Sequence, residues 1–340
     1  RRAARCAASR LALAAGGVAA GLAIGASAPA AAASALAERN DELLRELQQV
    51  HRLDDAELAR VREIFRRSGF IGQGNPAISR HPLTRDECLA RQRPADPDAA
   101  RFERICGAPN MAPLYDPESG TPEQARACID RYEFPDIVCE YPVVWVRARE
   151  AAELCSAVGK RLCDAHEWEG ACDGRLLAPD YRFDLARGVP AGTAVQRMRA
   201  AHNAVADRRW SYGAQYRSGV CAAASPKTPG CAGGGWNACG SNTYPAGSFP
   251  DCRSPLGVYD LNGNAAEHMN LPLDPSQMAS AGSTTLGVTE MKGSWFVFDL
   301  YRAHEDWCRW RAPFWHGSRV LDPASHANYH LGLRCCKTLP

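Results

Sequence analysis

The sequence predicts an α+β fold with little regular secondary structure, preceded by a short helical segment. Apolar residues recur at helical spacing between residues 35 and 69, and again in two shorter stretches, 149–159 and 164–172. Gly, Pro and Asn turns crowd the stretch from Pro179 to Pro255. The chain of 340 residues also holds fifteen cysteines, which is typical of a loop-rich domain held by cross-links.

Residues 1–34 read as a secretory signal peptide. Four arginines among the first ten residues precede an apolar run from 11 to 24, and the small-residue stretch "SAPAAAASA" predicts cleavage between Ala28 and Ala35. A membrane anchor is the alternative, but the run is short for a bilayer span and rich in Ala and Gly. We therefore expect export to the periplasm or the cell exterior, with no membrane span after cleavage.

The cysteine count and the charge narrow the class of protein. Cleavage removes Cys6 and leaves fourteen cysteines, an even number, which in an exported chain indicates disulfides. No pair of Cys-x-x-Cys knuckles is present, so structural zinc is not expected. The formal net charge of +2 comes with no basic stripe, so we expect no nucleic-acid partner and no binding to a membrane surface.

The segment from 35 to 69 predicts two amphipathic helices. Asp54 or Asp55 is placed to cap the second helix, and Gly69 is placed to end it. A dimerisation arm and a helix pair packed on the main domain are both compatible with this pattern, and we favour packing. The apolar positions are Leu43, Leu44, Leu47, Val50, Leu58, Val61, Ile64 and Phe65.

The remaining chain divides into a connecting segment and a domain. Residues 70–126 are rich in Pro, Gly and Asp without a sustained period, which predicts an irregular segment, tied by Cys88 and Cys106. Residues 127–340 are long enough for a core of their own. Near the start of this domain, "PVVWV" predicts a short buried strand, and Asp164 and Glu167 have the spacing of a capping box at a helix start.

Five motifs occur in one order along this domain: "IDRYE", "GKRLCDAHEWEGAC", "GVYDLNGNAAEH", "KGSW" and "GLRCC". Together they resemble the formylglycine-generating enzyme family, also called sulfatase-modifying factor domains, over roughly residues 127 to 337. The resemblance implies an irregular variant of the C-type lectin fold. That fold agrees with the many turns between Pro179 and Pro255.

The resemblance implies calcium at the loop "NGNAAE". The ligands would be Asn262, Gly263, Ala265 and Glu267, the Gly and Ala through their carbonyls, and such hard oxygen donors suit calcium. A second family site implies Asn203. The alternative for the loop is a tight turn in which its polar side chains bond neighbouring backbone.

The resemblance also implies disulfide partners. Cys155 with Cys335 and Cys172 with Cys308 occupy positions of family bridges, and Cys163 with Cys336 stand in the same motifs as a parallel third bridge. Each bridge would close a long stretch of chain and stabilise the fold by a few kcal/mol.

The family oxidises a substrate cysteine with oxygen through copper(I), held by two thiolates that suit this soft ion. The two positions, counted from Ser294, hold Val297 and Arg302 here, and Cys308 is the one cysteine between Ser294 and Cys335. Copper-dependent formylglycine formation is therefore not expected.

Two classes of function stay open. One is a binding module with a pocket near Ser294, His268 and His330 for a protein, peptide or small-molecule ligand. The other is a divergent oxygen-dependent oxidoreductase that modifies a protein or peptide, by formylglycine formation or by related non-haem metal chemistry. Iron lacks support, because His51 is the one histidine in the N-terminal helices where a three-histidine site would need more.

Overall fold

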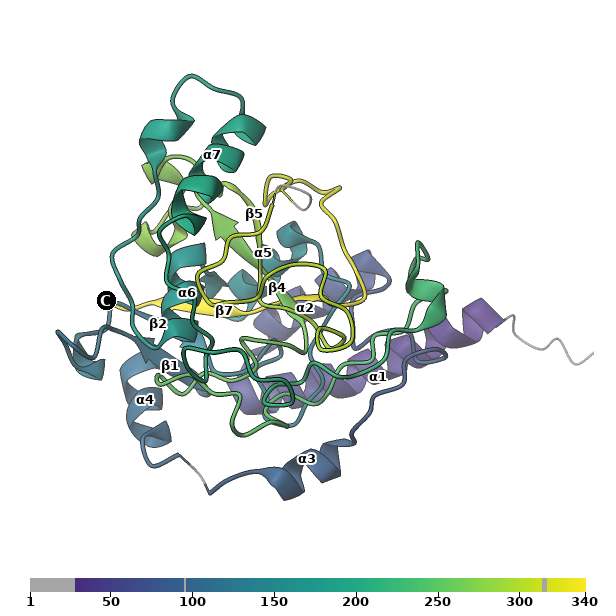
Figure 1. Ribbon diagram of the computed structural model, residues 1–340. Helices are drawn as coiled ribbons and strands as arrows, with labels where there is room; N and C mark the ends of the chain where they lie inside the picture. Colours follow the sequence, from purple (N-terminus) through teal and green to yellow (C-terminus); the bar gives the residue numbers. More distant parts are fainter. Residues whose placement is uncertain (1–27, 95, 314–316) are drawn as a thin grey trace, which may run out of the picture.

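The computed structural model describes residues 28–94, 96–313 and 317–340. Within these residues, seven α-helices and two small β-sheets are joined by long stretches without regular structure (Figure 1), which confirms the predicted α+β class. Residues 1–27 of the predicted signal peptide lie outside the described residues, and residues 28–34 form the start of the first helix. Among the helices that are described, none is both long and apolar enough to cross a membrane.

The two predicted N-terminal helices are present as α1 (Ala28–His51) and α2 (Asp55–Ser68). Asp54 caps α2: its carboxylate accepts the Glu57 N–H at 2.7 Å, and the Glu57 carboxylate accepts the Asp54 N–H at 2.9 Å. Gly69 ends the helix in the left-handed region with a φ of 76°. Both predicted helix boundaries of α2 are confirmed.

The helix pair packs on the domain rather than standing apart from it. Leucines of α1 and the apolar face of α2 share one buried core with Val143, Val146 and Leu333. In Figure 1, α2 runs next to α5 (Ala148–Ala157). Burial of this apolar stripe is what stabilises such short helices, so the predicted packing arrangement is confirmed.

The segment from 70 to 126 is more regular than predicted. It contains α3 (Arg85–Arg91), α4 (Ala99–Cys106) and β1 (Met111–Leu114). Each helix is short, and β1 forms only because it pairs with a strand outside the segment, so no local period reveals them. Cys88 and Cys106 do tie this segment, as expected, and their partners Cys139 and Cys128 lie in the domain that follows.

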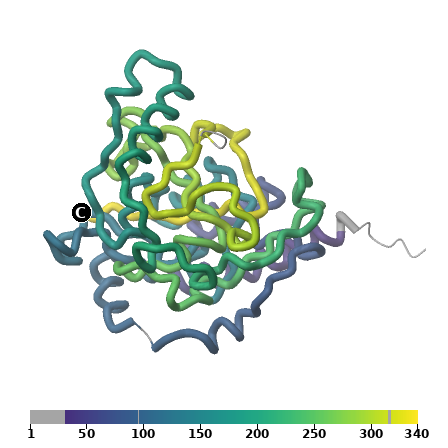
Figure 2. Tube along the Cα trace, viewed as in Figure 1, coloured from purple at the N-terminus to yellow at the C-terminus, as the bar shows by residue number. Residues whose placement is uncertain are grey.

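The first sheet has the strand order β1-β2-β7-β3 and is antiparallel, with β2 (Ala127–Asp130), β3 (Arg161–Leu162) and β7 (Cys335–Thr338). The C-terminal strand thus lies between two early strands, and Figure 2 shows the chain end close to the segment that holds β1 and α4. The stretch "PVVWV" is buried but forms no strand: Val144 makes one isolated bridge, to Gly72.

The second sheet has the order β5-β4-β6, with β4 (Ala266–Leu271), β5 (Val288–Lys292) and β6 (Leu331–Leu333). Two helices precede it, α6 (Ala165–Asp173) and α7 (Ala191–Asn203). The predicted capping box at α6 is present in one half, since the Glu167 carboxylate accepts the Asp164 N–H at 2.9 Å. The Asp164 carboxylate itself accepts from Ser280 at 2.6 Å, and so holds a distant loop.

Disulfides tie the helices to the sheets. The three predicted bridges are confirmed: two fix α5 and the start of α6 to β7, and the third fixes α6 to the loop before β6. Within the described residues every cysteine is bonded. The seven bridges are Cys88–Cys139, Cys106–Cys128, Cys155–Cys335, Cys163–Cys336, Cys172–Cys308, Cys221–Cys252 and Cys231–Cys239.

Candidate functional site

The loop before β4 is a tight turn that its sequence specifies. Gly263 has a φ of +86°, and a Cβ there would lie 2.9 Å from the Ala222 carbonyl oxygen, so only glycine fits. Asp260 and Asn264 have φ values of 56° and 55°. Asp and Asn tolerate this region better than other residues with side chains. The string "DLNGN" therefore encodes the turn directly.

Asn264 and Glu133 hold the turn in place. The Asn264 amide oxygen accepts the Tyr244 N–H at 2.8 Å, and its amide nitrogen donates to Glu133 at 2.7 Å. The other Glu133 oxygen accepts the Ala265 N–H at 2.8 Å. Burial raises the pKa of Glu133 well above its usual value, and the nearby acids Asp260 and Glu267 raise it further. For Asn264, these contacts match the turn alternative.

Glu267, the one predicted calcium ligand with a carboxylate, is engaged by other side chains. Its oxygens accept from the Arg334 guanidinium at 2.8 to 3.1 Å and from the Trp168 indole N–H at 2.6 Å. All three side chains are buried. In this arrangement a guanidinium already balances the carboxylate, and the group does not fit a calcium ion, which needs six or more oxygens.

The other predicted calcium ligands are likewise in structural contacts. The Asn262 amide oxygen accepts the Ser211 N–H at 3.0 Å, and its amide nitrogen donates to the Asp306 carbonyl at 2.6 Å. Asn203 exchanges two hydrogen bonds with the Arg311 backbone, at 2.9 and 3.0 Å. Calcium binding through Asn262, Gly263, Ala265 and Glu267 stays a prediction, and it would require Glu267 to leave Arg334.

Ser294 lines a small cavity beside the same turn, with a volume of about 10 Å³, which is room for about one water molecule. The preceding Gly293 has a φ of +73°, and a Cβ on it would lie 2.9 Å from the Leu261 carbonyl oxygen. The Ser294 hydroxyl accepts the Gly263 N–H at 2.9 Å and donates to Asp306 at 3.2 Å. The cavity is lined by Tyr212, Tyr216, Arg217, Gly219, Cys221, Ala223, Asn262, Gly263, Ser294, Asp299 and Asp306.

Asp306 is the buried acid of this cavity. Its carboxylate accepts from the Trp210 indole N–H at 2.7 Å and from the Ser294 hydroxyl. Burial raises the pKa of Asp306 to about 6, although both hydrogen bonds and Arg302 favour the charged form. Asp306 therefore gains its negative charge as the pH rises through about 6.

Asp299 lines the same cavity, and Arg302 lies against the cavity residue Tyr216. The Asp299 carboxylate accepts from the Tyr216 hydroxyl, from the Ser218 hydroxyl at 2.8 Å and from the Gly219 N–H at 3.1 Å. The Arg302 guanidinium lies 3.8 Å from the centre of the Tyr216 ring, a cation–π contact. Carboxylates, phenols and a guanidinium therefore lie close together here, and they contact one another.

The two positions that hold copper thiolates in the family have other roles here. Val297 is buried among aromatic side chains, and Arg302 lies on Tyr216. Cys308 is bonded to Cys172. In the described part of the chain no cysteine is left as a thiol, so the described residues offer no soft ligand pair.

The three predicted pocket residues are not in one pocket. His268 is in β4 of the second sheet, and one of its ring nitrogens lies 2.9 Å from the Val146 carbonyl oxygen. His330 stacks on Trp295 with the ring centres 4.5 Å apart. Neither histidine lines the cavity beside Ser294. Ser294 thus remains part of a candidate site, and the two histidines belong to the packing around it.

Glu169, Asp180 and His202 lie close enough together to hold a metal ion, but basic side chains already balance their negative charge. Carboxylates of Glu169 and Asp180 approach His202, with ligand atoms within 4.8 Å of one another. However, Glu169 accepts from Lys292 at 2.6 Å and from Arg311 at 2.9 Å. Burial would raise the pKa of Glu169, but these cations lower it to about 2. Two buried cations occupy the place of a metal, and the group is a structural ion network.

Sequence reasoning missed most of the residues that line the cavity. Asp299 and Asp306 follow the "KGSW" motif but lie in none of the five family motifs. Three further lining residues, Tyr212, Tyr216 and Arg217, come from a turn-rich loop. The signal that could have found them is weak: two carboxylates shortly after Ser294, where the family has thiolates.

Comparison with known protein families decides the assignment. The family model of the sulfatase-modifying factor enzyme 1-like domain matches residues 123–339. The chain belongs to this family. The resemblance seen in the five motifs is confirmed, and the match covers both the turn before β4 and the cavity beside Ser294.

Two solved structures resemble this sulfatase-modifying factor protein weakly. CarF is 13% identical with a TM-score of 0.34, and the match covers 63% of this chain and 87% of CarF. PvdO from Pseudomonas aeruginosa is 14% identical with a TM-score of 0.33, over 67% of this chain and 91% of PvdO. Likeness at this level carries no argument about function. A search of curated proteins gives no match.

Proposed function

We propose that this sulfatase-modifying factor protein is exported and binds a peptide or small polar ligand in the pocket of about 640 Å³ at Tyr212 and Arg217, which borders the cavity beside Ser294, without copper-dependent formylglycine formation. One observation carries the proposal: Val297 and Arg302 take the thiolate positions while Cys308 is bonded to Cys172. Copper(I) needs soft ligands, and a guanidinium is a cation that cannot ligate it.

The chemistry of this pocket supports binding. Asp251 supplies acceptors, Arg209 and Arg217 supply donors, and Tyr212 supplies a ring face. A ligand that carries both amide and charged groups, such as a peptide, satisfies such a mixed surface better than an apolar ligand does, because buried polar groups need partners.

Export is supported by the disulfides. Seven bridges in the described residues require an oxidising compartment to form, which the periplasm and the cell exterior provide and the cytosol does not. This agrees with the signal peptide predicted for residues 1–34.

A displayed random-peptide library, selected on the immobilised protein, tests the binding role. Enriched peptides should bind roughly tenfold more weakly to Arg217→Glu, because the change replaces an attraction at the pocket with a repulsion. Arg197→Glu is the matched control, since Arg197 is exposed on α7 and outside the pocket. Copper or iron at close to one ion per chain in the purified protein would replace the binding role with the oxidoreductase.

A further inference from the structure

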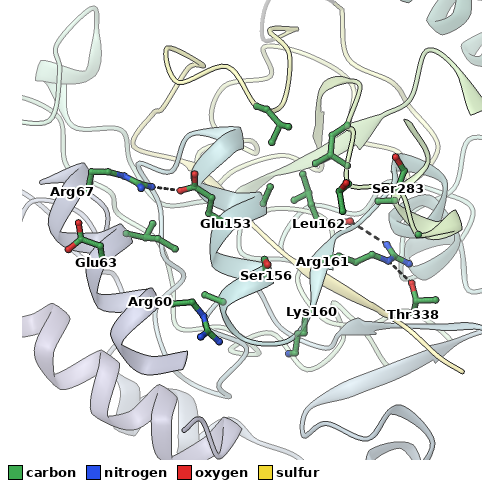
Figure 3. Close-up of a pocket in the computed structure, with 18 of the residues that line it drawn as sticks. Arg60, Glu63, Arg67, Glu153, Ser156, Lys160, Arg161, Leu162, Ser283 and Thr338 are labelled. Carbon is green, nitrogen blue, oxygen red and sulfur yellow. Dashed lines mark hydrogen bonds and ion pairs between the residues drawn. The ribbon is translucent and has the colours of Figure 1, made fainter. Parts of the chain in front are cut away.

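Another hollow lies apart from the cavity beside Ser294. It is a groove of about 860 Å³ between α2, α5 and the loop 279–286, and the two share no lining residue (Figure 3). Its apolar walls include Ile64, Ala157, Leu162, Leu286 and Leu321. A volume in this range and a mostly apolar lining with few polar groups are typical of small-ligand sites.

Charge is distributed unevenly around the groove. Four basic and two acidic side chains line it. Arg67 pairs with Glu153 on one side, as Figure 3 shows. Glu63 pairs with Arg66 at 2.7 Å, so both acids are compensated within the protein.

The basic side chains at the other end of the groove differ in whether an acidic side chain already neutralises them. Figure 3 places Arg60 and Lys160 near each other, away from the Arg67–Glu153 pair. Lys160 is buried against Asp130 and Asp136, at 2.5 and 3.2 Å, and Arg161 pairs with Glu167 at 2.6 Å. Arg60 is exposed and makes no ion pair within the described residues. One end of the groove therefore offers an uncompensated guanidinium.

The lining decides which class of molecule fits. A peptide would place backbone N–H and C=O groups against Ile64, Ala157 and Leu286, where they find few partners. A peptide could also bind as an extra strand beside the edge strand β3, but this needs free backbone groups on β3. The Leu162 carbonyl is already occupied, because the Arg161 side chain donates to it at 3.3 Å. A hydrocarbon chain has no such groups to satisfy.

We propose that the groove binds a single-chain amphiphile, with its acyl chain along the apolar walls and its carboxylate at Arg60. The carboxylate of the amphiphile meets Arg60, the one uncompensated cation among the lining residues of the groove. The acyl chain moves out of water and packs against the apolar side chains of α2, α5 and the loop 279–286, which is favourable. This site does not depend on the ligand of the pocket at Tyr212 and Arg217.

Titration calorimetry with saturated fatty acids below their micelle concentrations tests the proposal. From eight to twelve carbons, each added methylene should strengthen binding by about fourfold, the factor for its removal from water. Dodecyltrimethylammonium has a twelve-carbon chain and a positive end. It should bind at least tenfold more weakly than dodecanoate, because an attraction between exposed charges at Arg60 is replaced by a repulsion. Affinity that ignores chain length, or that favours the cation, would refute the proposal.

Four variants locate the site. Arg60→Glu should weaken dodecanoate by roughly tenfold, whereas Arg45→Glu, at an exposed arginine of α1 outside the groove, should not. Ser156→Trp fills the groove from an exposed position of α5 and should abolish binding, with Gln49→Trp at an exposed position of α1 outside the groove as control. Unchanged binding of dodecanoate to Ser156→Trp would overturn the assignment. So would a wild-type dimer that becomes a monomer in Ser156→Trp, measured by sedimentation, because a second copy of the chain would then fill the groove.

Discussion

Replacement of Glu267 by Gln tests what the turn before β4 depends on. The carboxylate of Glu267 and the guanidinium of Arg334 are both fully buried, with contacts of 2.8 to 3.1 Å. Gln keeps the shape and one acceptor for the Trp168 indole, but it leaves Arg334 without its closest counter-charge. Removal of one partner of a buried ion pair costs about 3 to 5 kcal/mol.

We expect the lower end of that range, because burial and the Glu267 charge together raise the pKa of Glu133 and of Asp260, and removal of that charge lets these acids ionise more readily beside Arg334. A loss of about 3 kcal/mol corresponds to a fall in Tm of roughly 6 to 12 °C for a domain of this size. Urea denaturation of both proteins, with calcium and again with chelator, gives the free energy of unfolding. Glu118→Gln is the control, since Glu118 is exposed in its pair with Arg175 and should cost under about 1 kcal/mol.

The calcium condition separates the two roles of Glu267. If the ion pair is what matters, the difference between wild type and Glu267→Gln is the same with calcium and with chelator. If calcium raises the stability of wild type and not of the variant, Glu267 is a ligand, since a ligand that binds only the folded state stabilises it. That result would refute the ion-pair account and restore the calcium prediction.

Two further predictions concern the cross-links and the buried acids. Non-reducing peptide mapping should find Cys155–Cys335, Cys163–Cys336 and Cys172–Cys308, and an alkylatable Cys308 would contradict the third bridge. Asp260 is buried with a pKa raised from 3.8 to about 7, mainly by burial. The folded state then binds more protons than the unfolded state in that window, so Asp260 lowers stability as pH rises through it. Asp260→Asn should be more stable than wild type at pH 8, with a gain that shrinks toward pH 4, and a variant less stable at pH 8 would contradict this sign.

Local sequence signals predicted the parts of the fold that depend on neighbouring residues. Asp54 and Gly69 bound α2 because capping is decided within one turn of helix. The positive φ values of the "DLNGN" turn likewise follow from the residues that occupy it. The family motifs gave the three long-range disulfides, which no spacing rule supplies.

What could not be predicted depends on residues far apart in the chain. Glu267 meets Arg334 only after β4 and β6 align in parallel, so its ion pair was invisible in the motif. Met111–Leu114 becomes a strand by pairing with β2, in a segment with no period of its own. Asp299 and Asp306 reach the cavity through an irregular loop, where neither helical nor strand spacing places side chains.

Mass spectrometry of a sulfatase-type Cys-x-Pro-x-Arg peptide, incubated with the protein, copper, reductant and oxygen, tests the central claim most directly. The copper chemistry needs two thiolates, and Val297, Arg302 and the bonded Cys308 supply none. We predict that the peptide cysteine remains a thiol or an ordinary disulfide. Conversion of that cysteine to the aldehyde, above the level in protein-free controls, would contradict the account and establish an oxidoreductase.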